Sequence, residues 1–299
     1  MGLKSVKPKK ILINYADEKF RSAQKYCTKM AYKRGKFDEV WEYGPGDVEP
    51  WMITSEVLAS TDDSRIGKYG LWRPYIVINS LQKMNDGDYL FYCDSGAYFN
   101  KSVDILIDLF ESDKLYLMSF DIPTLEKQWS KRDIFLYLDA DKKEFTDTPQ
   151  RMSGMFLVKK CRNSMVFFEE YYRISLNMPQ LFTDSDNELG MENYKEFICN
   201  RHNQSVFSIL TKKYGIEAYR DPTEFGDYPE YYALKPEFDY TPTSNKDVDY
   251  KKVIISHRYP EINAYRKIKL KIRTCIPIKL YFDVSFFMAN IRKKLRGNG

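Results

Sequence analysis

The residues best placed to do chemistry follow a short apolar run in the first third of the chain. Tyr89 to Cys93 (YLFYC) is typical of a buried strand, and Asp94, Ser95 and Gly96 come directly after it. A carboxylate at the carboxyl end of such a strand lies in the crevice where open α/β sheets bind ligands. The run therefore predicts a ligand-binding aspartate at position 94. The alternative is that Asp94 only caps a turn or a helix.

A pair of carboxylates would indicate a metal site. A hard divalent cation that bridges two phosphates prefers carboxylate oxygens, and an Asp-x-Asp motif supplies them. Gly96 occupies the place of a second aspartate after Asp94, whereas Asp139 and Asp141 in FLYLDADKK keep the full spacing. We prefer Asp94, because Asp139 and Asp141 precede a Lys-rich polar stretch where a helix end or a loop is expected.

Alternating strands and helices must position Asp94. Apolar and helical patterns predict strands over 10–15, 37–43, 89–93 and 114–120, and helices over 17–34, 74–84 and 103–112. In the second half they predict strands over 154–158 and 253–256, and helices over 164–174 and 204–214. This succession predicts an α/β fold with a largely parallel sheet. The Pro- and Tyr-rich segment 221–243 is predicted to be a long loop that could cover a binding site.

Three sequence blocks carry a resemblance to a known family. Gly70 to Phe99 holds a Trp-x-Pro-Tyr helix before the strand that ends in Asp-x-Gly. Ser130 to Phe135 (SKRDIF) is similar to a Thr-Lys-Arg-Asp block, and Arg201 to Leu210 (RHNQSVFSIL) is similar to a His-Asp-Gln-Ser block. With TPQRMSG at Thr148 to Gly154, the likeness extends from Ile11 to Tyr219. The chain thus resembles bacterial and viral glycosyltransferases of the GT-A type from capsule and O-antigen clusters.

The resemblance implies a fold, an activity and a cofactor. The fold would be that of a nucleotide-diphospho-sugar transferase, with a Rossmann-like, mostly parallel sheet and flanking helices. The activity would be transfer of a sugar from a nucleotide-sugar donor, UDP-based by resemblance, to a hydroxyl of a cell-surface glycan or lipid-linked acceptor. The cofactor would be a divalent metal ion, Mn²⁺ or Mg²⁺, although Gly96 in place of the second aspartate puts the metal in question.

Cations near these blocks suit the diphosphate of such a donor. A departing nucleoside diphosphate needs its growing negative charge stabilised, and Arg73, Lys131 and Arg132 could supply positive charge. Each of them could instead serve in a surface ion pair. The residues expected to bind the donor are Arg73, Asp94, Ser95, Gly96, Lys131, Arg132 and His202.

The expected catalytic residues are Asp133, Asn203 and Gln204. Asp133 is a candidate base for the acceptor hydroxyl, or it is simply the ion-pair partner of the two cations before it. Similar enzymes have Asp where this chain has Asn203, and an amide cannot accept a proton as a carboxylate does. Asn203 and Gln204 can still hydrogen-bond sugar hydroxyls. The alternative is that they belong, with Ser205, to a cluster that caps the following helix.

A late histidine completes the candidates for metal binding. His257 in ISHRYP follows the last predicted strand and is similar in position to a histidine that binds metal in some retaining GT-A enzymes. The chain has only two histidines, and a single histidine is a weak metal signal. The tentative metal ligands are therefore Asp94 and His257, with Asp139 and Asp141 as the alternative pair.

Positive charge is concentrated near the C-terminal end. The net charge is +5, but 266–296 alone holds ten Lys or Arg against one Asp, which leaves the other residues mildly acidic. An apolar stripe at helical spacing borders a basic end in this region. The stripe is Leu280, Val284, Phe287, Ile291 and Leu295, and the basic end is Arg292, Lys293, Lys294 and Arg296.

These patterns predict two parts of the chain. We expect a GT-A-like transferase domain over 1–263 and a basic amphipathic appendage over 264–299. The segment 278–296 would suit an anionic membrane surface, and the alternative is a helix that packs on the body with a solvated basic edge.

Composition excludes several classes of protein. With 43% hydrophobic and 30% charged residues, the chain is expected to fold into a globular protein. Five cysteines without a Cys-x-x-Cys pair indicate neither a disulfide framework nor a zinc ribbon and favour a reducing compartment. No signal-peptide region and no apolar stretch of membrane-spanning length is found. We expect a cytoplasmic protein, peripheral on the inner face of the membrane, that binds no nucleic acid.

Two other functions stay open at this point. Gly96 and Asn203 would also suit a non-catalytic protein that binds sugar nucleotides or glycans. A peripheral membrane adaptor could act through the basic C-terminal segment alone.

Overall fold

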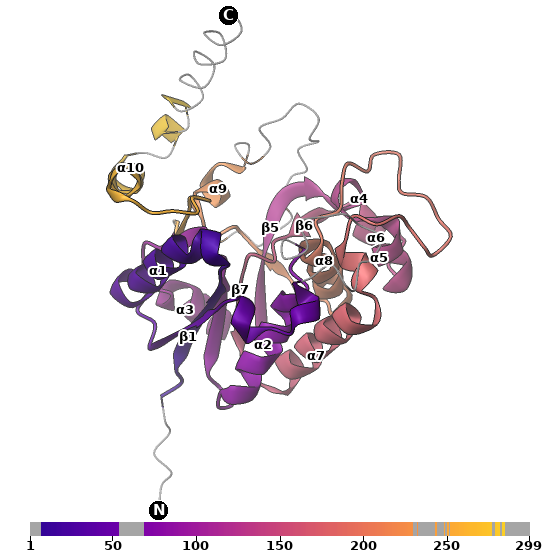
Figure 1. Cartoon of the computed structure of the whole chain (residues 1–299), viewed down its shortest axis with the longest axis horizontal. Coiled ribbons are helices and arrows are strands. Elements are labelled where there is room, and N and C mark those ends of the chain that lie inside the picture. Colours follow the sequence, from indigo (N-terminus) through magenta and orange to yellow (C-terminus); the bar gives the residue numbers. More distant parts are fainter. Residues whose placement is uncertain are drawn as a thin grey trace, which may run out of the picture.

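Seven strands form the central sheet in a computed structural model, which describes residues 7–53, 69–229, 252–276 and the short stretches 232, 243, 248, 250, 279–281 and 283–284. The strands are β1 (Lys10–Tyr15), β2 (Glu39–Tyr43), β3 (Tyr89–Cys93), β5 (Leu117–Leu125), β6 (Pro149–Arg151), β7 (Met155–Lys159) and β8 (Ala218–Tyr219). Their order is β2-β1-β3-β7-β5-β6, and β8 pairs with β5 (Figure 1).

The sheet contains both parallel and antiparallel strand pairs. Strand β1 runs parallel to both β2 and β3, and β8 runs parallel to β5. Strand β7 is antiparallel to β3 and β5, and β6 is antiparallel to β5. The carboxyl ends of β1 and β3 therefore meet at one edge of the sheet, and the start of β7 lies beside them. Two further strands, β4 (Ala97–Phe99) and β9 (Ile254–Ser256), form a separate antiparallel pair.

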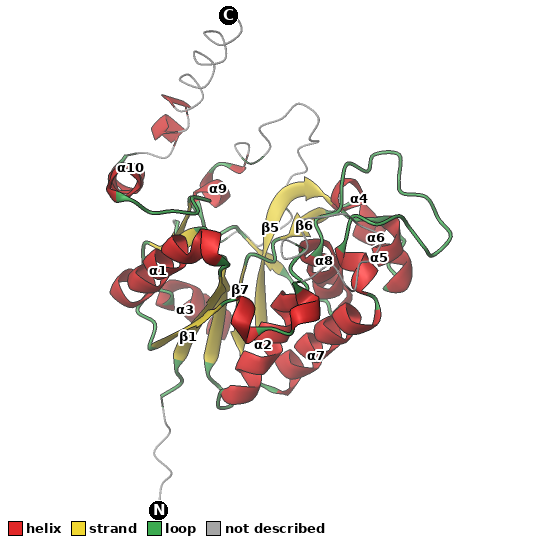
Figure 2. Cartoon of the chain, viewed as in Figure 1, coloured by secondary structure: helices red, strands yellow, loops and turns green. Residues whose placement is uncertain are grey.

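Helices cover both faces of the sheet (Figure 2). The longer ones are α1 (Arg21–Met30), α2 (Trp72–Lys83), α3 (Asp104–Ser112), α7 (Arg162–Asn177), α8 (Asn203–Lys213) and α10 (Ala264–Cys275). The shorter helices are α4 (Glu126–Trp129), α5 (Arg132–Tyr137), α6 (Lys143–Thr146) and α9 (Glu224–Asp227), with single turns η1 (Glu18–Phe20), η2 (Ala31–Gly35), η3 (Pro45–Asp47), η4 (Pro50–Met52) and η7 (Pro179–Phe182).

Alternate strand residues supply the two halves of the hydrophobic core, as the period of two in a strand requires. Ile11 and Ile13 of β1 pack in one cluster with residues of α2, α7 and α8. Leu12 packs in the other cluster with residues of α1 and α3. The α/β class predicted from the sequence is confirmed.

Most predicted elements are present, and two boundaries moved for local reasons. The helix expected over 17–34 begins with the η1 turn, where the Asp17 side chain accepts a hydrogen bond from Phe20 N–H, and it ends at Lys36, whose φ is 61°. The strand expected over 114–120 begins at Leu117 instead, because Lys114 adopts a left-handed φ of 53° in the turn after α3. A residue with positive φ cannot continue a strand.

Helix α10 packs on the body through one face. Leu270 and Arg273 are buried, and Arg273 forms an ion pair with the buried Glu224 of α9. Tyr265, Ile268 and Ile272 lie exposed on the outer side. Of the predicted apolar stripe, Leu280 and Val284 are exposed, whereas Phe287, Ile291, Leu295 and the basic end 292–296 lie outside the described residues.

Most of the predicted loop 221–243 also lies outside the described residues, which there include 221–229, 232 and 243.

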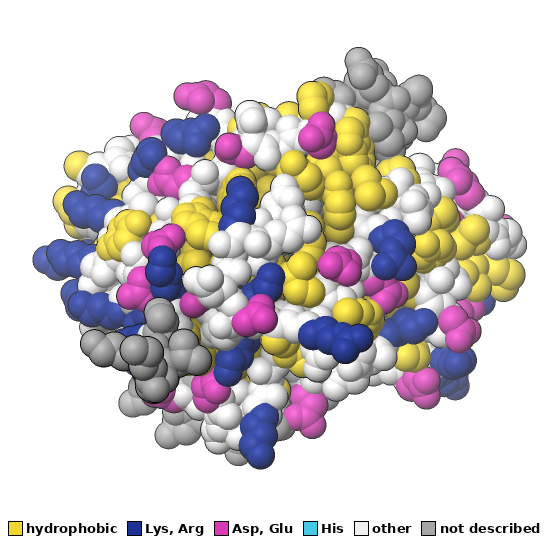
Figure 3. All heavy atoms as spheres, turned by 90° about the horizontal axis from the view of Figure 1, so that it is seen from below, with side chains coloured by type: hydrophobic (Ala, Val, Ile, Leu, Met, Phe, Trp, Pro, Cys, Tyr) yellow, Lys and Arg dark blue, Asp and Glu magenta, His cyan; other side chains and the backbone are white. Residues whose placement is uncertain are grey.

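Within the described part of the chain, no helix is both long and apolar enough to span a bilayer. On the face seen in Figure 3, Lys and Arg side chains alternate with Asp and Glu side chains and with apolar patches.

Candidate functional site

A cavity of about 750 Å³ opens at the edge of the sheet where β1 and β3 end. Tyr15 to Asp17 follow β1 on its wall, and Asp94 to Gly96 follow β3. Ser95 Oγ joins the two strand ends by donating to the carbonyl of Tyr15 over 2.7 Å. The other walls come from α2, from the β6–β7 turn, from the start of α8, and from the segments around Asp221 and Arg258. The cavity thus lies in the crevice where open α/β sheets bind ligands.

An ion pair between the buried Arg73 and the half-exposed Asp94 lines this cavity. Arg73 of α2 donates to Asp94 Oδ1 over 2.8 Å and to Ser153 Oγ over 2.7 Å. Tyr92 O–H donates to the same Asp94 oxygen over 2.7 Å. Burial by itself would lower the pKa of Arg73, but the charge of Asp94 together with the nearby Tyr92 and Tyr171 hydroxyls raises it. Arg73 is therefore permanently charged, and it fixes the orientation of Asp94.

Gly154 leaves room for Asp94. A Cβ atom on Gly154 would lie 2.6 Å from Asp94 Oδ2, which is closer than real Cβ contacts allow. The backbone of Gly154 also accepts the Asp94 N–H over 2.8 Å. Only glycine at position 154 is compatible with this carboxylate position.

Asn203 and its neighbours at the start of α8 are held in the same network. Asn203 Oδ1 accepts from Arg73 and, over 2.6 Å, from Ser153, and its amide group donates to the carbonyl of Tyr69 over 2.9 Å. Gln204 donates to Gln150 Oε1 over 3.0 Å. His202 lies 2.9 Å from Asp184 Oδ1, with no side-chain capping bond to α8. Asn203 is thus saturated by protein partners, which gives it a positioning role for Arg73.

The β4–β9 pair fixes a second turn against Asp94. The carbonyl of Gly96 accepts from the backbone N–H groups of His257 and Arg258 over 2.8 and 2.9 Å. His257 is buried, and its Nδ1 accepts the N–H of Tyr259 over 2.9 Å. Burial, with the charge of Arg266, lowers the pKa of His257 to about 4, so the imidazole is neutral at physiological pH.

Seven of the residues expected to act chemically line the cavity, and six do not. The seven are Arg73, Asp94, Ser95, Gly96, His202, Asn203 and Gln204. The six that are absent from its lining are Lys131, Arg132, Asp133, Asp139, Asp141 and His257.

The residues of the Lys-Arg-Asp block hold a neighbouring loop instead. Lys131 Nζ donates to the carbonyls of Gln180, Ser185 and Asp186, and burial lowers its pKa. The Asp133 carboxylate accepts the backbone N–H groups of Glu188 and Leu189. Both side chains therefore form hydrogen bonds with the 180–189 segment and do not line the cavity.

The side chains of the full Asp-x-Asp motif, Asp139 and Asp141, do not line the cavity either. Asp141 accepts from Arg132 over 3.0 Å and from the hydroxyl of Tyr194. Asp139 adopts a left-handed φ of 50° in the turn after α5. The two aspartates at 139 and 141 therefore belong to the end of helix α5, and neither lines the cavity that contains Asp94.

Four charged residues on the cavity wall, Asp17 among them, were not singled out from the sequence as site residues. Asp221 is buried, and burial, opposed by its hydrogen bond to Thr223, raises its pKa to about 6. Arg201 lies over the ring of Trp129 at 4.6 Å from its centroid, and Arg258 lies 6.0 Å from the ring centroid of Tyr232. Arg201 opens the RHNQS block and Arg258 follows His257, so their places in those motifs were the available signals.

Apolar and aromatic side chains complete the wall. Trp72 stacks on Tyr15 at 3.8 Å between ring centroids, and both line the cavity with Trp129 and Phe225. Such rings suit the flat faces of a nucleobase or a sugar. The cavity combines these faces with three carboxylates, Asp17, Asp94 and Asp221, and with three arginines, Arg73, Arg201 and Arg258. In the described part of the chain, no group of three or more His, Cys, Asp or Glu residues could hold a metal ion.

The chain resembles several solved structures, all at low sequence identity. No protein-family model matches it, and no curated protein does. Mouse xyloside xylosyltransferase 1 in its apo form is 8% identical, with a TM-score of 0.46 over 83% of this chain and 98% of that one. The glycosyltransferase GlyE of Streptococcus pneumoniae is 12% identical, with a TM-score of 0.43 over 94% of this chain and 64% of that one. A glycosyltransferase involved in the glycosylation of the major capsid of PBCV-1 is 12% identical, with a TM-score of 0.34 over 57% of this chain and 69% of that one.

Proposed function

We propose that the protein is a glycosyltransferase that moves a sugar from a nucleoside diphosphate donor to a hydroxyl group. The observation that carries this proposal is the cavity beyond β1 and β3, where Arg73 orients Asp94 among aromatic rings and arginines. A volume of about 750 Å³ falls in the range of sites for cofactor-sized ligands. The sequence blocks that resemble GT-A enzymes contribute Arg73, Asp94 and Asn203 to this cavity.

The cavity groups suit the charge changes of such a transfer. The bond between the anomeric carbon and the diphosphate oxygen breaks, and both electrons leave with the diphosphate. The acceptor oxygen bonds to the anomeric carbon, and its proton passes to a base. Arginines oppose the growing negative charge of the leaving group.

Asp221 is the base that we propose for the acceptor proton. Its pKa of about 6 leaves it ionised at neutral pH yet basic enough to take a proton. Asp94 is committed to Arg73 and Tyr92, and Asp133 is committed to backbone N–H groups outside the cavity. Asn203 and Gln204 are then positioning and sugar-binding groups.

The partners follow from the same resemblance. We propose a uridine-based donor and, as acceptor, a cell-surface glycan such as a capsule or O-antigen chain, or its lipid-linked precursor. The exposed Tyr265, Ile268 and Ile272 of α10 extend toward the basic segment 278–296 along the sequence. This arrangement supports peripheral docking of the enzyme on an anionic inner-leaflet surface.

A second candidate is a non-catalytic protein that binds sugar nucleotides. It is favoured by Asn203, which stands where similar enzymes have a carboxylate and whose side chain is saturated by Arg73, Ser153 and Tyr69. Such a protein would bind the donor without turning it over.

Thermal unfolding with a panel of nucleoside diphosphates and nucleotide sugars tests the proposal. One ligand class should raise the melting temperature of the full chain, and Asp94→Asn should bind it at least about tenfold more weakly because its amide cannot balance the charge of Arg73. Asp139→Asn is the matched control, since Asp139 lies outside the cavity, and it should bind like the wild type. Release of the nucleoside diphosphate with acceptor present separates an enzyme from a binding protein. Absence of stabilisation by every ligand would contradict both functions.

A further inference from the structure

Two arginines on the cavity wall lack a carboxylate partner among the described residues. Arg73 is ion-paired with Asp94 at 2.8 Å, but no such pair to a described residue is found for Arg201 or Arg258. Arg258 is solvent-exposed, and the Nε atom of Arg201 is buried without a hydrogen-bond partner. Guanidinium groups that line a cavity without an ion-pair partner attract an anion, because no carboxylate is bound to them directly.

Arg201 and Arg258 line the same cavity as Tyr232. Both charges act on the hydroxyl of Tyr232, whose pKa is raised by burial and lowered by Arg201 and by Arg258. The charge of Arg258 also lowers the pKa of Asp221, although no ion pair joins the two residues. Arg201 and Arg258 therefore act together on one region, beside the turn formed by Asp94 and Gly96.

Arg258 is held in this place by its backbone. Its φ of 55° is left-handed, and its N–H bonds to the carbonyl of Gly96 over 2.9 Å. A Cβ atom on Gly96 would lie 3.3 Å from the Arg258 Cα atom. The second aspartate of an Asp-x-Asp motif would thus crowd the backbone that carries Arg258, and this chain has glycine there.

The remaining donors do not fit a divalent metal ion. Neutral His257 uses Nδ1 to accept the N–H of Tyr259, so its proton resides on Nε2 and neither nitrogen has a lone pair for a metal. Asp94 Oδ1 already accepts from Arg73 and Tyr92, which leaves Oδ2 alone. Asp17 and Asp221 also line the cavity, but in the described part of the chain no three His, Cys, Asp or Glu side chains come together, which is short of the ligand set that Mn²⁺ or Mg²⁺ requires.

We propose that Arg201 and Arg258, and not a divalent metal ion, bind the diphosphate of the donor. The proposal rests on the transferase function above, and it assigns the phosphate site within that cavity. The planar guanidinium fork matches phosphate oxygens in a bidentate way and keeps its charge at every physiological pH. Two arginines then balance the charge that develops on the leaving diphosphate, which is the task of the metal in metal-dependent transferases.

Binding of UDP by calorimetry, in excess EDTA and in Mn²⁺, tests this assignment in the full chain. UDP should bind with the same affinity in both conditions. Arg201→Gln and Arg258→Gln should each weaken binding in EDTA by about tenfold or more, because each removes a charge-assisted hydrogen-bond pair. Arg258→Lys should lose less affinity than Arg258→Gln. Arg266→Gln is the matched control, since Arg266 bonds the carbonyl of Glu261 outside the cavity, and it should bind UDP normally.

The outcomes separate this inference from the function on which it rests. Unchanged melting temperatures of the unliganded variants would show that lost affinity is not unfolding. UDP binding that requires Mn²⁺ and is unaffected by Arg201→Gln and Arg258→Gln would overturn the arginine site and leave the transferase function standing. If no nucleoside diphosphate binds in either condition, the transferase function itself fails.

Discussion

At the scale of one residue, the raised pKa of Asp221 predicts that the stability of the protein depends on pH. Its folded pKa of about 6 lies above the ordinary value of 3.8, so the folded protein holds an extra proton between these two values. Stability should therefore fall as the pH rises from about 4 to about 6 and should then level off. Asp221→Asn removes this loss and keeps an acceptor for the N–H of Thr223. Relative to the wild type, the variant should gain about 2–3 kcal/mol in the free energy of unfolding between pH 4 and pH 8.

Urea unfolding of both proteins across this range measures the gain, because all other titrating groups are common to them. The cations Arg220 and Arg258 and the hydroxyl of Tyr250 lie near Asp221 and are present in both. The same substitution should abolish sugar transfer and spare UDP binding if Asp221 is the base. A stability difference that stays constant from pH 4 to pH 8 would contradict the raised pKa.

Single residues of the cavity could be predicted from the sequence where a long strand or a sequence block marked them, as with Arg73 and Asn203. Asp94, Ser95 and Gly96 follow β3 directly, so the apolar run before them was sufficient to place them at the sheet edge. Asp221 follows the two-residue strand β8, which was not predicted, and Arg258 follows β9, which was predicted over 253–256 without any sign that it borders Asp94. Their approach to Asp94 depends on tertiary packing rather than on local pattern.

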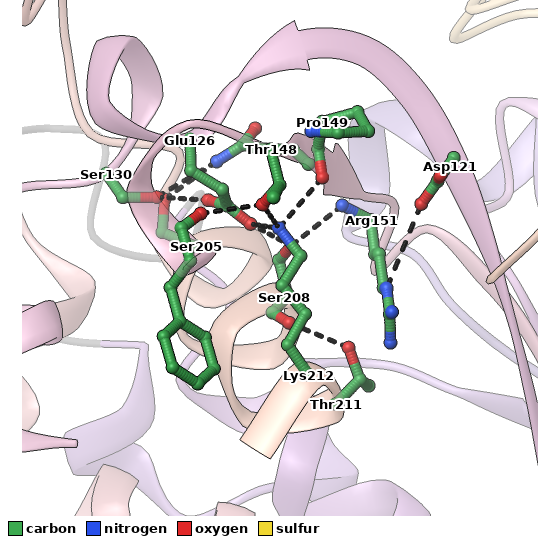
Figure 4. A network of polar contacts seen from close by, with 12 residues as sticks. Asp121, Glu126, Ser130, Thr148, Pro149, Arg151, Ser205, Ser208, Thr211 and Lys212 are labelled. Atoms are coloured by element: carbon green, nitrogen blue, oxygen red, sulfur yellow. Dashed lines mark hydrogen bonds and ion pairs between the residues drawn. The ribbon is translucent and has the colours of Figure 1, made fainter. Parts of the chain in front are cut away.

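At the scale of elements, a buried polar network holds α8 against β6 and α4 (Figure 4). Lys212 of α8 pairs with the fully buried Glu126 at 2.7 Å and donates to Thr148 Oγ1 and to the carbonyl of Pro149. Ser130 and Ser208 donate to the same carboxylate. Because α8 begins at Asn203, this network sets the position of the cavity wall.

Lys212→Met should cost about 3–5 kcal/mol of stability, because it leaves Glu126 buried without a cation. Adding Glu126→Gln to that variant should recover part of the loss, and the double-mutant cycle measures the coupling. Lys213→Met is the control, since the exposed Lys213 bonds only the carbonyl of Leu138 among these elements, and it should cost about 1 kcal/mol or less. A loss for Lys212→Met no larger than for Lys213→Met would contradict the role of the network.

Three of the sequence blocks contribute hydrogen-bonding residues to this region. Ser130, Gln150 and Ser205 come from three different blocks, and Gln150 Nε2 donates to the hydroxyl oxygens of both serines. The order of the blocks carried the resemblance but gave no expectation that these segments meet. It did not predict that Lys131 and Asp133 would turn away from the cavity toward the 180–189 segment, because a block records which residues recur and not which way they point.

At the scale of the whole molecule, charge separates the body from its C-terminal segment. Acidic and basic side chains are mixed on the face in Figure 3, whereas 266–296 holds ten Lys or Arg against one Asp. Leu270 and Arg273 of α10 are buried, so α10 packs on the body, whereas the choice between membrane and body for 278–296 stays a prediction. The part of the appendage beyond α10 keeps its predicted role in membrane docking as a proposal.

Deletion of 278–299 should separate docking from catalysis. The deletion removes five Lys or Arg and leaves Leu270 and Arg273 of α10 in place, but it also removes the Tyr281 ring 5.3 Å from the Arg273 guanidinium, so the melting temperature of the body should fall only slightly. Each basic residue near an anionic surface contributes about 1 kcal/mol, so affinity for phosphatidylglycerol vesicles should fall by about 10³-fold. Vesicle co-sedimentation measures the affinity, and release of the nucleoside diphosphate with a soluble acceptor measures turnover.

Neutral phosphatidylcholine vesicles are the control, because only the anionic surface should attract the full chain, and added salt should weaken that attraction. An enzyme should keep its soluble turnover after the deletion, since every described wall of the cavity comes from residues before 278. An adaptor that acts through the basic segment would lose its function with that segment. Equal binding of the full and the shortened chain to anionic vesicles would instead place docking on the exposed Tyr265, Ile268 and Ile272 of α10, and would contradict the assignment to 278–296.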